Sequence, residues 1–374
     1  MRVQLSKLGV SIDQRQILTD LDFEAQENEY MVILGSSGSG KTTALRVIAG
    51  LQKPNIGEVR IDGKLMNGTA PRNRNVSMVF QKDALFPHLR LIDALRQGQP
   101  SGITAADASR QLRQVTKLTR IDGLLDRYPD QLSGGELRRA ALAQAMARRS
   151  AVRMLDEPLS AIDPHLRPEM QNDLLQWHRT VPGTTIHVTH DGEEAMQLAD
   201  RISVLAQGRI LQCDTPEIIY QRPQHLEVAT ALGSPPINLL PALLDHKENL
   251  RGEGSLRGKA LFASNSAPCR VLIGVRPHEL TASLAEEKKL DSRTENGIQL
   301  AADLIDVRRG IQNFRITARW NGQLIHAVLA DQQQVSAVQN QSIIRLRANL
   351  EHLHLFHQDT GRRIDPKTDF CRTI

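Results

Sequence analysis

The chain has 374 residues, of which 40% are hydrophobic and 24% charged, and its formal net charge is +5 at pH 7. This is the composition of an ordinary globular protein, and the length predicts two or three domains, each with its own core. No run of 18 apolar residues occurs, and Met1 leads directly into a strand-like segment. We therefore expect neither a transmembrane helix nor a signal peptide, and a cytoplasmic location.

Composition also argues against two classes of site. Aromatic residues make up only 3% of the chain, and the basic residues form no dense stripe, so we expect no nucleic-acid partner. The three cysteines lie far apart and form no C-x-x-C pair, which indicates free thiols in a reducing compartment.

Residues 1–232 alternate short β-branched runs with longer helical patterns, which predicts an α/β domain with a largely parallel sheet. The first informative segment is an apolar run at 30–34, followed by GSSGSGKT at 35–42 and a helix-like run at 43–49. This order matches the G-x-x-x-x-G-K-[ST] phosphate loop. A chance Gly/Ser loop is the alternative, and the flanking strand and helix disfavour it.

Each part of the loop has a physical role. The glycines let backbone N–H groups turn toward phosphate oxygens, and the following helix adds the positive end of its dipole. Lys41 should reach the β- and γ-phosphates, and Thr42 should place its hydroxyl on Mg²⁺. The predicted nucleotide-binding residues here are Gly35, Ser36, Ser37, Gly38, Ser39, Gly40, Lys41, Thr42 and Thr43.

The pattern becomes helical between about residues 82 and 148, as at 105–115, where Thr104 is a plausible N-cap. A helical insertion therefore interrupts the α/β domain. Next, a strand-like run at 152–155 ends in Asp156 and Glu157, which could hold Mg²⁺ through water and polarise a hydrolytic water. Residues 132–136, LSGGE, form either an anion cradle before a helix or an ordinary Ser N-cap with a Gly turn.

Beyond residues 233–236 the character changes again. Runs at 269–275, 313–320 and 342–347 alternate polar with apolar residues, which predicts a small antiparallel β domain, most simply a barrel, over 233–374. Residues 285–296 are expected to form an exposed loop. His352, His354 and His357 could be interpreted as a metal cluster, but no carboxylate or cysteine is spaced to complete it, and strand surface is the better interpretation.

Taken in order, GSSGSGKT, Phe80-Gln81, LSGGE, MLDEP, Ser160-Ala161-Ile162-Asp163 and Val188-Thr189-His190-Asp191 resemble the motifs of the ATP-binding-cassette ATPases. The resemblance implies a P-loop NTPase (RecA-like) core with a helical insertion, followed by an OB/TOBE-like β-barrel. It also implies ATP and Mg²⁺ as ligands. In the family pattern Gln81 senses Mg²⁺ and water, and His190 contacts the γ-phosphate. Glu157, His190 and Gln81 are thus the expected catalytic residues, and Thr42, Gln81 and Asp156 the metal site.

The same resemblance implies a shared site. Ser133, Gly134, Gly135, Glu136 and Asp163 would face the nucleotide bound by an opposing subunit, so a dimer, most simply a homodimer, is expected. Segments at 194–202 and 208–220 look like those of importer ATPases, and segments at 274–278 and 353–356 most resemble the maltose and glycerol-3-phosphate branch. This implies two transmembrane permease subunits at the cytoplasmic face of the membrane and, indirectly, a solute-binding protein. Phe86-Pro87-His88-Leu89 resembles the groove that receives the permease's coupling helix.

Alternatives remain at this point: import of a polyamine, sulfate or ferric iron, a cassette protein of translation or DNA repair, or a regulator that binds ATP as a switch. Ile12 stands 23 residues before Gly35, where the family usually stacks an aromatic ring on adenine. Because base stacking is worth roughly 1–3 kcal/mol, we expect nucleotide affinity to be about tenfold weaker here. Glu136 replaces the usual glutamine of the signature. Arg153 lies in an apolar strand and is expected to find a carboxylate or to reach solvent.

Overall fold

The structure is a computed structural model of the full chain. It describes residues 1–79, 85–97, 104–148, 150–160, 162–245, 249–252, 256–259, 268–284, 297–309, 314–329 and 342–364. By its internal contacts the chain divides into two compact units, Met1–Ile219 and Tyr220–Ile374. No helix among the described residues is long and apolar enough to span a membrane.

The helices are α1 Lys41–Ala49, α2 Leu91–Gln97, α3 Ala105–Leu118, α4 Gly134–Ala147, α5 Arg167–Thr180, α6 Gly192–Leu198, α7 Pro216–Gln221 and α8 Leu226–Ala231, with short 3₁₀ turns η1 Pro71–Asn73, η2 Asp122–Leu124, η3 Pro129–Gln131 and η5 Leu350–His352. The strands of the first unit are β1 Val3–Ile12, β2 Arg15–Ala25, β3 Tyr30–Leu34, β4 Ile56–Ile61, β5 Lys64–Leu65, β6 Val76–Val79, β7 Val152–Asp156, β8 Thr184–Thr189, β9 Arg201–Ala206 and β10 Arg209–Asp214. Those of the second are β11 Asn238–Leu244, β12 Asn249–Gly252, β13 Arg257–Lys259, β14 Cys269–Val275, β15 Thr281–Leu284, β16 Gly297–Arg309, β17 Phe314–Trp320, β18 Gln323–Leu329, β19 Ile343–Asn349 and β20 Leu353–His357.

The first unit contains two sheets around α1. One is antiparallel with the strand order β2-β1-β4-β5, and the other has the order β10-β9-β3-β8-β7-β6. In the second sheet, strands β9, β3, β8, β7 and β6 run parallel, and only the edge strand β10 is antiparallel. Apolar residues of α1 pack with those of both sheets in a single buried cluster. The predicted α/β class is confirmed.

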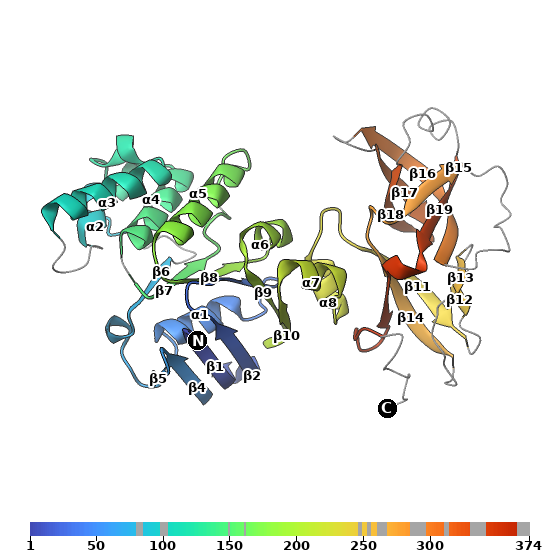
Figure 1. The fold of residues 1–374 in the computed structure, drawn as a ribbon, viewed down its shortest axis with the longest axis horizontal. Helices are drawn as coiled ribbons and strands as arrows, with labels where there is room; N and C mark the ends of the chain where they lie inside the picture. The colour runs from blue at the N-terminus through green and yellow to red at the C-terminus, as the bar shows by residue number, and fades with distance from the viewer. Residues whose placement is uncertain are drawn as a thin grey trace. The chain divides into compact units, whose positions relative to one another are not determined.

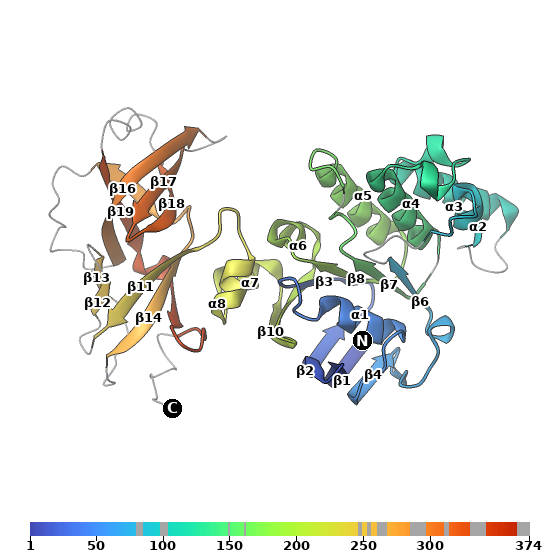
Figure 2. The same cartoon turned by 180° about the vertical axis from the view of Figure 1, so that it is seen from behind.

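The helical insertion lies on the other side of the parallel sheet. Helices α4 and α5 lie on the side of this sheet opposite α1, and α3 packs against α4, as both views show (Figures 1 and 2). Their buried residues form a second cluster, which includes Leu112, Leu142 and Trp177. The predicted cap is confirmed, because the Thr104 hydroxyl accepts the N–H of Asp107 at 3.2 Å and so begins α3.

The second unit contains a closed barrel. Its strands follow the order β17-β18-β15-β19-β16 and continue through β13, β12, β11, β14 and β20, while β17 also pairs with β16. The five strands β16 to β19 and β15 therefore close on themselves, which removes the exposed sheet edges that would otherwise invite association. All of these pairs are antiparallel except β15 with β18. The predicted OB/TOBE-like architecture is confirmed.

Arg276 holds the segment by which the chain enters this unit. Its guanidinium is buried, donates to the carbonyls of Leu232 at 2.6 Å and Ala229 at 3.0 Å, and lies 4.1 Å over the Tyr220 ring. Burial lowers the pKa of Arg276, while the nearby Tyr220 and Glu279 oppose that shift. The segment 220–232 is thus tied to the end of β14 by backbone acceptors and ring stacking.

The interpretation of the C-terminal histidines as strand surface was wrong for two of them. His352 ends the turn η5 and its Nδ1 lies 3.1 Å from a Glu279 carboxylate oxygen. His354 is buried in β20, where burial and the nearby cations Arg363, Arg276 and His352 lower its pKa to about 4. The described residues hold no group of three or more His, Cys, Asp or Glu that could bind a metal ion. The predicted loop at 285–296 lies outside the described residues.

Candidate nucleotide site

Three neighbouring parallel strands deliver the site's main chain segments to one edge. β3 ends at Leu34 opposite Thr189 of β8, and Asp156 of β7 pairs with Val188 of the same strand. Because parallel strands end at a common edge, the loops that follow β3, β7 and β8 start side by side. Two main-chain bonds join them: Gly35 N–H donates to Thr189 O at 3.3 Å, and Glu157 N–H donates to Val188 O at 2.9 Å.

The predicted phosphate loop connects β3 to α1, as the sequence indicated. Gly40 has φ +107°, and a Cβ there would lie 2.6 Å from a Leu18 methyl, so only glycine fits before the first turn of α1. A Cβ on Gly35 would lie 2.2 Å from the carbonyl oxygen of Leu205. No side chain caps the helix at Gly40, so the first N–H groups of α1 remain suited to an anion.

Lys41 is held above this loop. Its Nζ donates to the carbonyls of Gly35 and Ser36, both at 2.8 Å. Burial lowers the pKa of Lys41, while the carboxylates of Glu157 and Asp156 oppose that shift. The ammonium group is thus already directed at the loop's centre by contacts that phosphate oxygens could replace.

The Thr42 hydroxyl and a carboxylate oxygen of Asp156 meet at 3.0 Å. Burial raises the pKa of Asp156, and the hydrogen bond from Thr42 opposes this effect. A hydroxyl and one carboxylate are hard oxygen ligands of the kind that Mg²⁺ combines with water and substrate phosphates, so the residues present fit this ion. Gln81 lies outside the described residues, although β6 ends at Val79 and pairs with β7.

Glu157 and His190 also lie together. His190 Nδ1 is 3.2 Å from a carboxylate oxygen of Glu157, and the imidazole is 59% exposed. Glu157 has φ +48°, a left-handed conformation that is costly for a residue with a side chain. Three hydrogen bonds maintain this backbone conformation: the Glu157 N–H donates to Val188 O, and the Glu157 carbonyl accepts from the Ser160 N–H and the Ser160 hydroxyl. The turn places Glu157 directly after Asp156, whose carboxylate meets the Thr42 hydroxyl.

The LSGGE segment begins α4, and both of its interpretations have support in the geometry. Ser133 is the N-cap and forms a reciprocal capping box with Glu136, whose carboxylate accepts from the Ser133 N–H and hydroxyl, both at 2.8 Å. The hydrogen bonds from Ser133 lower the pKa of Glu136, so the departure from glutamine leaves a carboxylate here. Among the described residues, no hydrogen bond or ion pair joins residues 133–136 to the phosphate loop of the same chain.

Arg138 is a residue that sequence reasoning missed. It is buried in α4 and donates to the carbonyls of Asp156 at 2.7 Å, Glu157 at 2.5 Å and Pro158 at 3.1 Å. The signature helix is thereby fastened to the loop that carries both acids. A basic residue two positions after Glu136, on a helix that is rich in alanine from residue 140 onward, was the available signal.

The expectation for Arg153 was wrong. The guanidinium is buried away from solvent, pairs with no carboxylate among the described residues, and donates to the carbonyls of Val181 at 3.0 Å and Gly183. It lies 4.4 Å over the Trp177 ring and 3.3 Å from His178 Nδ1. Burial lowers its pKa to about 10, which leaves it charged at neutral pH. Backbone carbonyls therefore replace the expected counter-charge.

Two remaining site residues lie at the margins. Ile12 is at the tip of the β1–β2 hairpin and is 38% exposed; Leu18 of the same hairpin is the residue that Gly40 approaches. Asp163 is exposed and its carboxylate accepts the His165 N–H at 2.8 Å.

One edge of the parallel sheet carries the phosphate loop, the acids Asp156 and Glu157, and His190. This arrangement defines a P-loop ATPase of the cassette type. The family model for ABC transporters matches residues 18–160. The chain is 34% identical over 363 residues to an sn-glycerol-3-phosphate import ATP-binding protein of Cupriavidus necator, covering 94% of this chain and 95% of that protein. The protein of the same name from Cereibacter sphaeroides is 35% identical over 353 residues, at 93% and 95% coverage.

Solved structures agree in fold. An ATP-binding subunit of an ABC transporter superposes with a TM-score of 0.55 at 21% identity, covering 59% of this chain and 93% of that one. An ATP-binding cassette bound to ADP and phosphate gives a TM-score of 0.52 at 25% identity, covering 57% and 98%. The chain belongs to the ABC transporter family, as an ATP-binding subunit of the import type. It is an ATPase coupled to transport.

Proposed function

We propose that this chain hydrolyses MgATP to energise uptake of glycerol 3-phosphate or a related sugar-type solute. The observation that carries the proposal is the meeting of the Thr42 hydroxyl with Asp156 beside the Glu157–His190 pair. The relatives in Cupriavidus and Cereibacter, aligned over nearly their whole length, are glycerol-3-phosphate import proteins and support this cargo over polyamine, sulfate or ferric iron.

Within the site, each residue has a distinct task. Lys41 and the N–H groups of the loop would bind the phosphates, and Thr42, Asp156 and Gln81 would hold Mg²⁺, which supplies charge neutralisation at the transferring phosphoryl group. Glu157 lies where its carboxylate can accept a proton from the attacking water. His190 can donate toward the phosphoryl oxygens and, through its contact with Glu157, orients that carboxylate.

Residues 133–136 and Asp163 would complete the site of a second copy of the chain. Their support is that Ser133 and Asp163 are exposed, that the small residues Gly134 and Gly135 begin α4, and that they make no described contact with their own phosphate loop. The similar cassette of known structure is itself dimeric. The Ser133 hydroxyl would exchange its bond to Glu136 for one to the partner's γ-phosphate.

We further infer that the chain acts at the cytoplasmic face of the membrane with two permease subunits and, through them, a solute-binding protein. Phe86 supports this inference, because its side chain is 48% exposed at the start of the helical insertion. Residues 1–232 would form the ATPase domain and residues 233–374 a regulatory domain. This boundary is thirteen residues beyond the contact-based division at Ile219.

A direct test compares Glu157→Gln with Glu193→Gln, an exposed acid on α6. Loss of the general base should lower steady-state ATP hydrolysis by about 10²–10⁴-fold, whereas the control should retain it. Glu157→Gln should also form a dimer in ATP, measured by light scattering. Unchanged hydrolysis in Glu157→Gln would exclude this assignment of the base. Uptake of labelled glycerol 3-phosphate in a deletion strain, against labelled sulfate and polyamine, tests the cargo.

A further inference from the structure

One buried strand carries polar side chains along one face. Every residue of β8 is buried, and Thr185, His187 and Thr189 alternate with Ile186 and Val188. Because successive side chains point to opposite faces of a sheet, the three polar residues share the face turned away from the apolar cluster around α1. Buried polar groups are costly unless they are paired, so their partners indicate what this face does.

The partners form a continuous chain across three elements. The Tyr30 hydroxyl on β3 lies 2.9 Å from His187 Nδ1, and His187 Nε2 lies 3.1 Å from Oε1 of Glu194 on α6. The other carboxylate oxygen of Glu194 accepts from the Thr189 hydroxyl at 2.5 Å. We call these four residues, Tyr30, His187, Glu194 and Thr189, the buried polar chain.

Two members of the buried polar chain, Tyr30 and Glu194, have shifted pKa values. Burial raises the pKa of Tyr30, so its hydroxyl stays protonated and donates. Burial opposes ionisation of Glu194, but the nearby His187 and the hydrogen bond from Thr189 outweigh it and hold the pKa of Glu194 below its usual value. The Thr189 hydroxyl donates to one oxygen of this carboxylate, His187 Nε2 lies beside the other, and His187 Nδ1 faces the Tyr30 hydroxyl.

The contact between His187 and Glu194 is the sensitive point of the chain. Nε2 and Oε1 are close, but they are not aligned as a hydrogen bond, and neither has a hydrogen-bond partner elsewhere among the described residues. Removing either group would leave the other buried and unpaired, which costs roughly 1–3 kcal/mol or more for a charged group. Glu194 is therefore strongly held in its present position.

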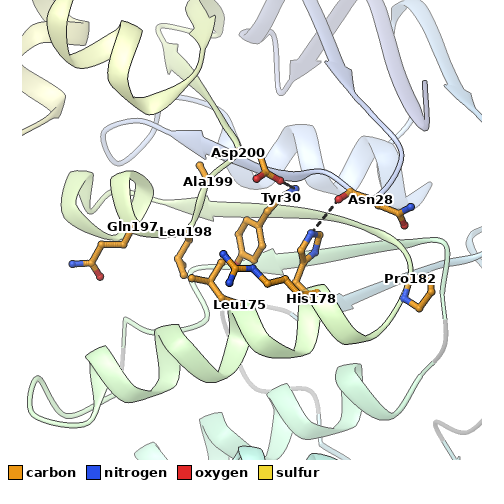
Figure 3. A pocket seen from close by; sticks show the side chains of 10 residues that line it. Asn28, Tyr30, Leu175, His178, Pro182, Gln197, Leu198, Ala199 and Asp200 are labelled. Carbon is orange, nitrogen blue, oxygen red and sulfur yellow. Dashed lines mark hydrogen bonds between the residues drawn. The ribbon is translucent and has the colours of Figure 1, made fainter.

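The outer end of the chain is anchored at the start of β3. Asp200 accepts the Tyr30 N–H at 2.8 Å and donates its own N–H to Tyr30 O at 2.9 Å. The His178 ring meets the Tyr30 ring edge-on at 5.1 Å. Figure 3 shows Tyr30 between Asp200 and His178. All three residues line a cavity of about 450 Å³.

The inner end fixes the residues on both sides of His190. The Thr189 hydroxyl accepts the Asp191 N–H at 3.0 Å, and Thr189 O accepts from Gly35 of the phosphate loop. The Asp191 carboxylate in turn caps α6 through the N–H groups of Glu193 and Glu194 at 2.9 and 3.2 Å. His190 thus stands in a turn whose neighbours are both bonded, directly or through α6, to Glu194.

We propose that Tyr30, His187 and Glu194 are positioning residues that hold His190 in its hydrolytic location beside Glu157. The proposal rests on the role given to His190 in the proposed function. The three residues are buried and act through Thr189 and the first turn of α6. Loss of the chain therefore lowers the rate of hydrolysis without weakening ATP binding, because the phosphate loop keeps its own contacts.

Two identical substitutions on the same face of β8 provide a matched test. Thr189→Val removes the hydroxyl that joins Glu194 to Asp191, whereas Thr185→Val removes a hydroxyl that bonds to His178 at 2.9 Å. Thr189→Val and Glu194→Gln should lower kcat about tenfold with KM for ATP within about twofold. Thr185→Val should keep the wild-type kcat, and Thr189→Ser should restore it. Tyr30→Phe, which deletes only the outer hydroxyl, should give a smaller loss in kcat, of about threefold.

A double-mutant cycle with His190→Ala decides whether the effect passes through His190. In that background Glu194→Gln should cause no further loss in single-turnover hydrolysis, because residues that act as a unit are not additive. An equal loss in both backgrounds, or unchanged kcat in Thr189→Val and Glu194→Gln, would overturn the proposal while leaving the proposed function intact. Full hydrolysis by His190→Ala would instead overturn the role of His190, and the positioning proposal with it.

Discussion

The two units of the molecule bury arginines by the same chemistry and use them differently. Arg138 in the first unit and Arg276 in the second each give their guanidinium N–H groups to main-chain carbonyls. Arg138 grips the loop that carries Asp156 and Glu157, whereas Arg276 grips the segment that leads into the barrel. The planar fork of arginine presents five N–H donors in a rigid geometry, so one side chain can bond several carbonyls at fixed positions. The comparison shows that the role of a buried arginine depends on the segment whose carbonyls it bonds, which is a catalytic loop for Arg138 and a connecting segment for Arg276.

The largest effect is expected from Arg138→Met. Three carbonyls around Glu157 lose their donor, and a displacement of about 1 Å in a catalytic group can cost about 10²-fold in rate. ATP hydrolysis should fall by about that factor, measured by phosphate release. Arg113→Met, an exposed arginine on α3, is the control and should retain the rate. An Arg138→Met variant that is as active as this control would show that the loop holds its position without Arg138.

Arg276→Met should separate stability from activity. Because buried carbonyls lose their donor and the stack on Tyr220 disappears, the second unit should lose about 2–4 kcal/mol of unfolding free energy. Hydrogen exchange should rise in α8, while ATP hydrolysis stays within about twofold of wild type. Arg270→Met, at an exposed position of β14, the strand that directly precedes Arg276, is the matched control. A fall in hydrolysis equal to that of Arg138→Met would remove the distinction between the two arginines.

The second unit should also carry its own acid sensitivity. His354 has a pKa of about 4 in the folded protein, below the value of about 6.5 for an unfolded histidine. The unfolded state therefore binds the proton first, and stability present above about pH 6.5 is lost as the pH falls toward 4, by up to about 3 kcal/mol. His354→Gln should flatten this pH dependence in denaturant titrations of the second unit. An unchanged slope between pH 6.5 and 4 would assign the acid sensitivity to other groups.

The smallest effect concerns Ile12. An aromatic ring at the tip of the β1–β2 hairpin should add base stacking, worth roughly 1–3 kcal/mol, so Ile12→Tyr should tighten ATP binding by about tenfold. The change should be smaller for a triphosphate that lacks a base. Equal gains for both ligands would mean that the hairpin contacts the phosphates or ribose instead.

Much of the first unit could be predicted because its signals are local. The strand at 30–34, the phosphate loop and the strand that ends at Asp156 lie where the sequence placed them. The closure of the barrel could not be predicted, because it depends on β17 pairing with β16 as well as with β18. The prediction for Arg153 was wrong because the sequence shows its charge but not the backbone carbonyls of Val181 and Gly183. Only the fold brings these acceptors close to the guanidinium.

The buried polar chain was missed for a different reason. Tyr30 was interpreted as part of an apolar run, and His187 lay just outside the motif around His190. A signal was present, since Thr185, His187 and Thr189 alternate with aliphatic residues in a strand that should be apolar on both faces if buried in a parallel sheet. Alternation in such a strand indicates a polar contact that needs partners elsewhere in the chain.

The pairing of β6 with β7 has a consequence for how such a protein diversifies. These two strands are neighbours in the sheet, yet the whole helical insertion lies between them in sequence. The sheet fixes where the chain leaves and where it returns, so α2 and α3 can change in length and surface without moving Asp156, whereas α4 is bonded to the Asp156 loop through Arg138. The fold thus separates a part that must stay constant, the edge where phosphate is handled together with α4, from two helices that can be rebuilt for each new partner.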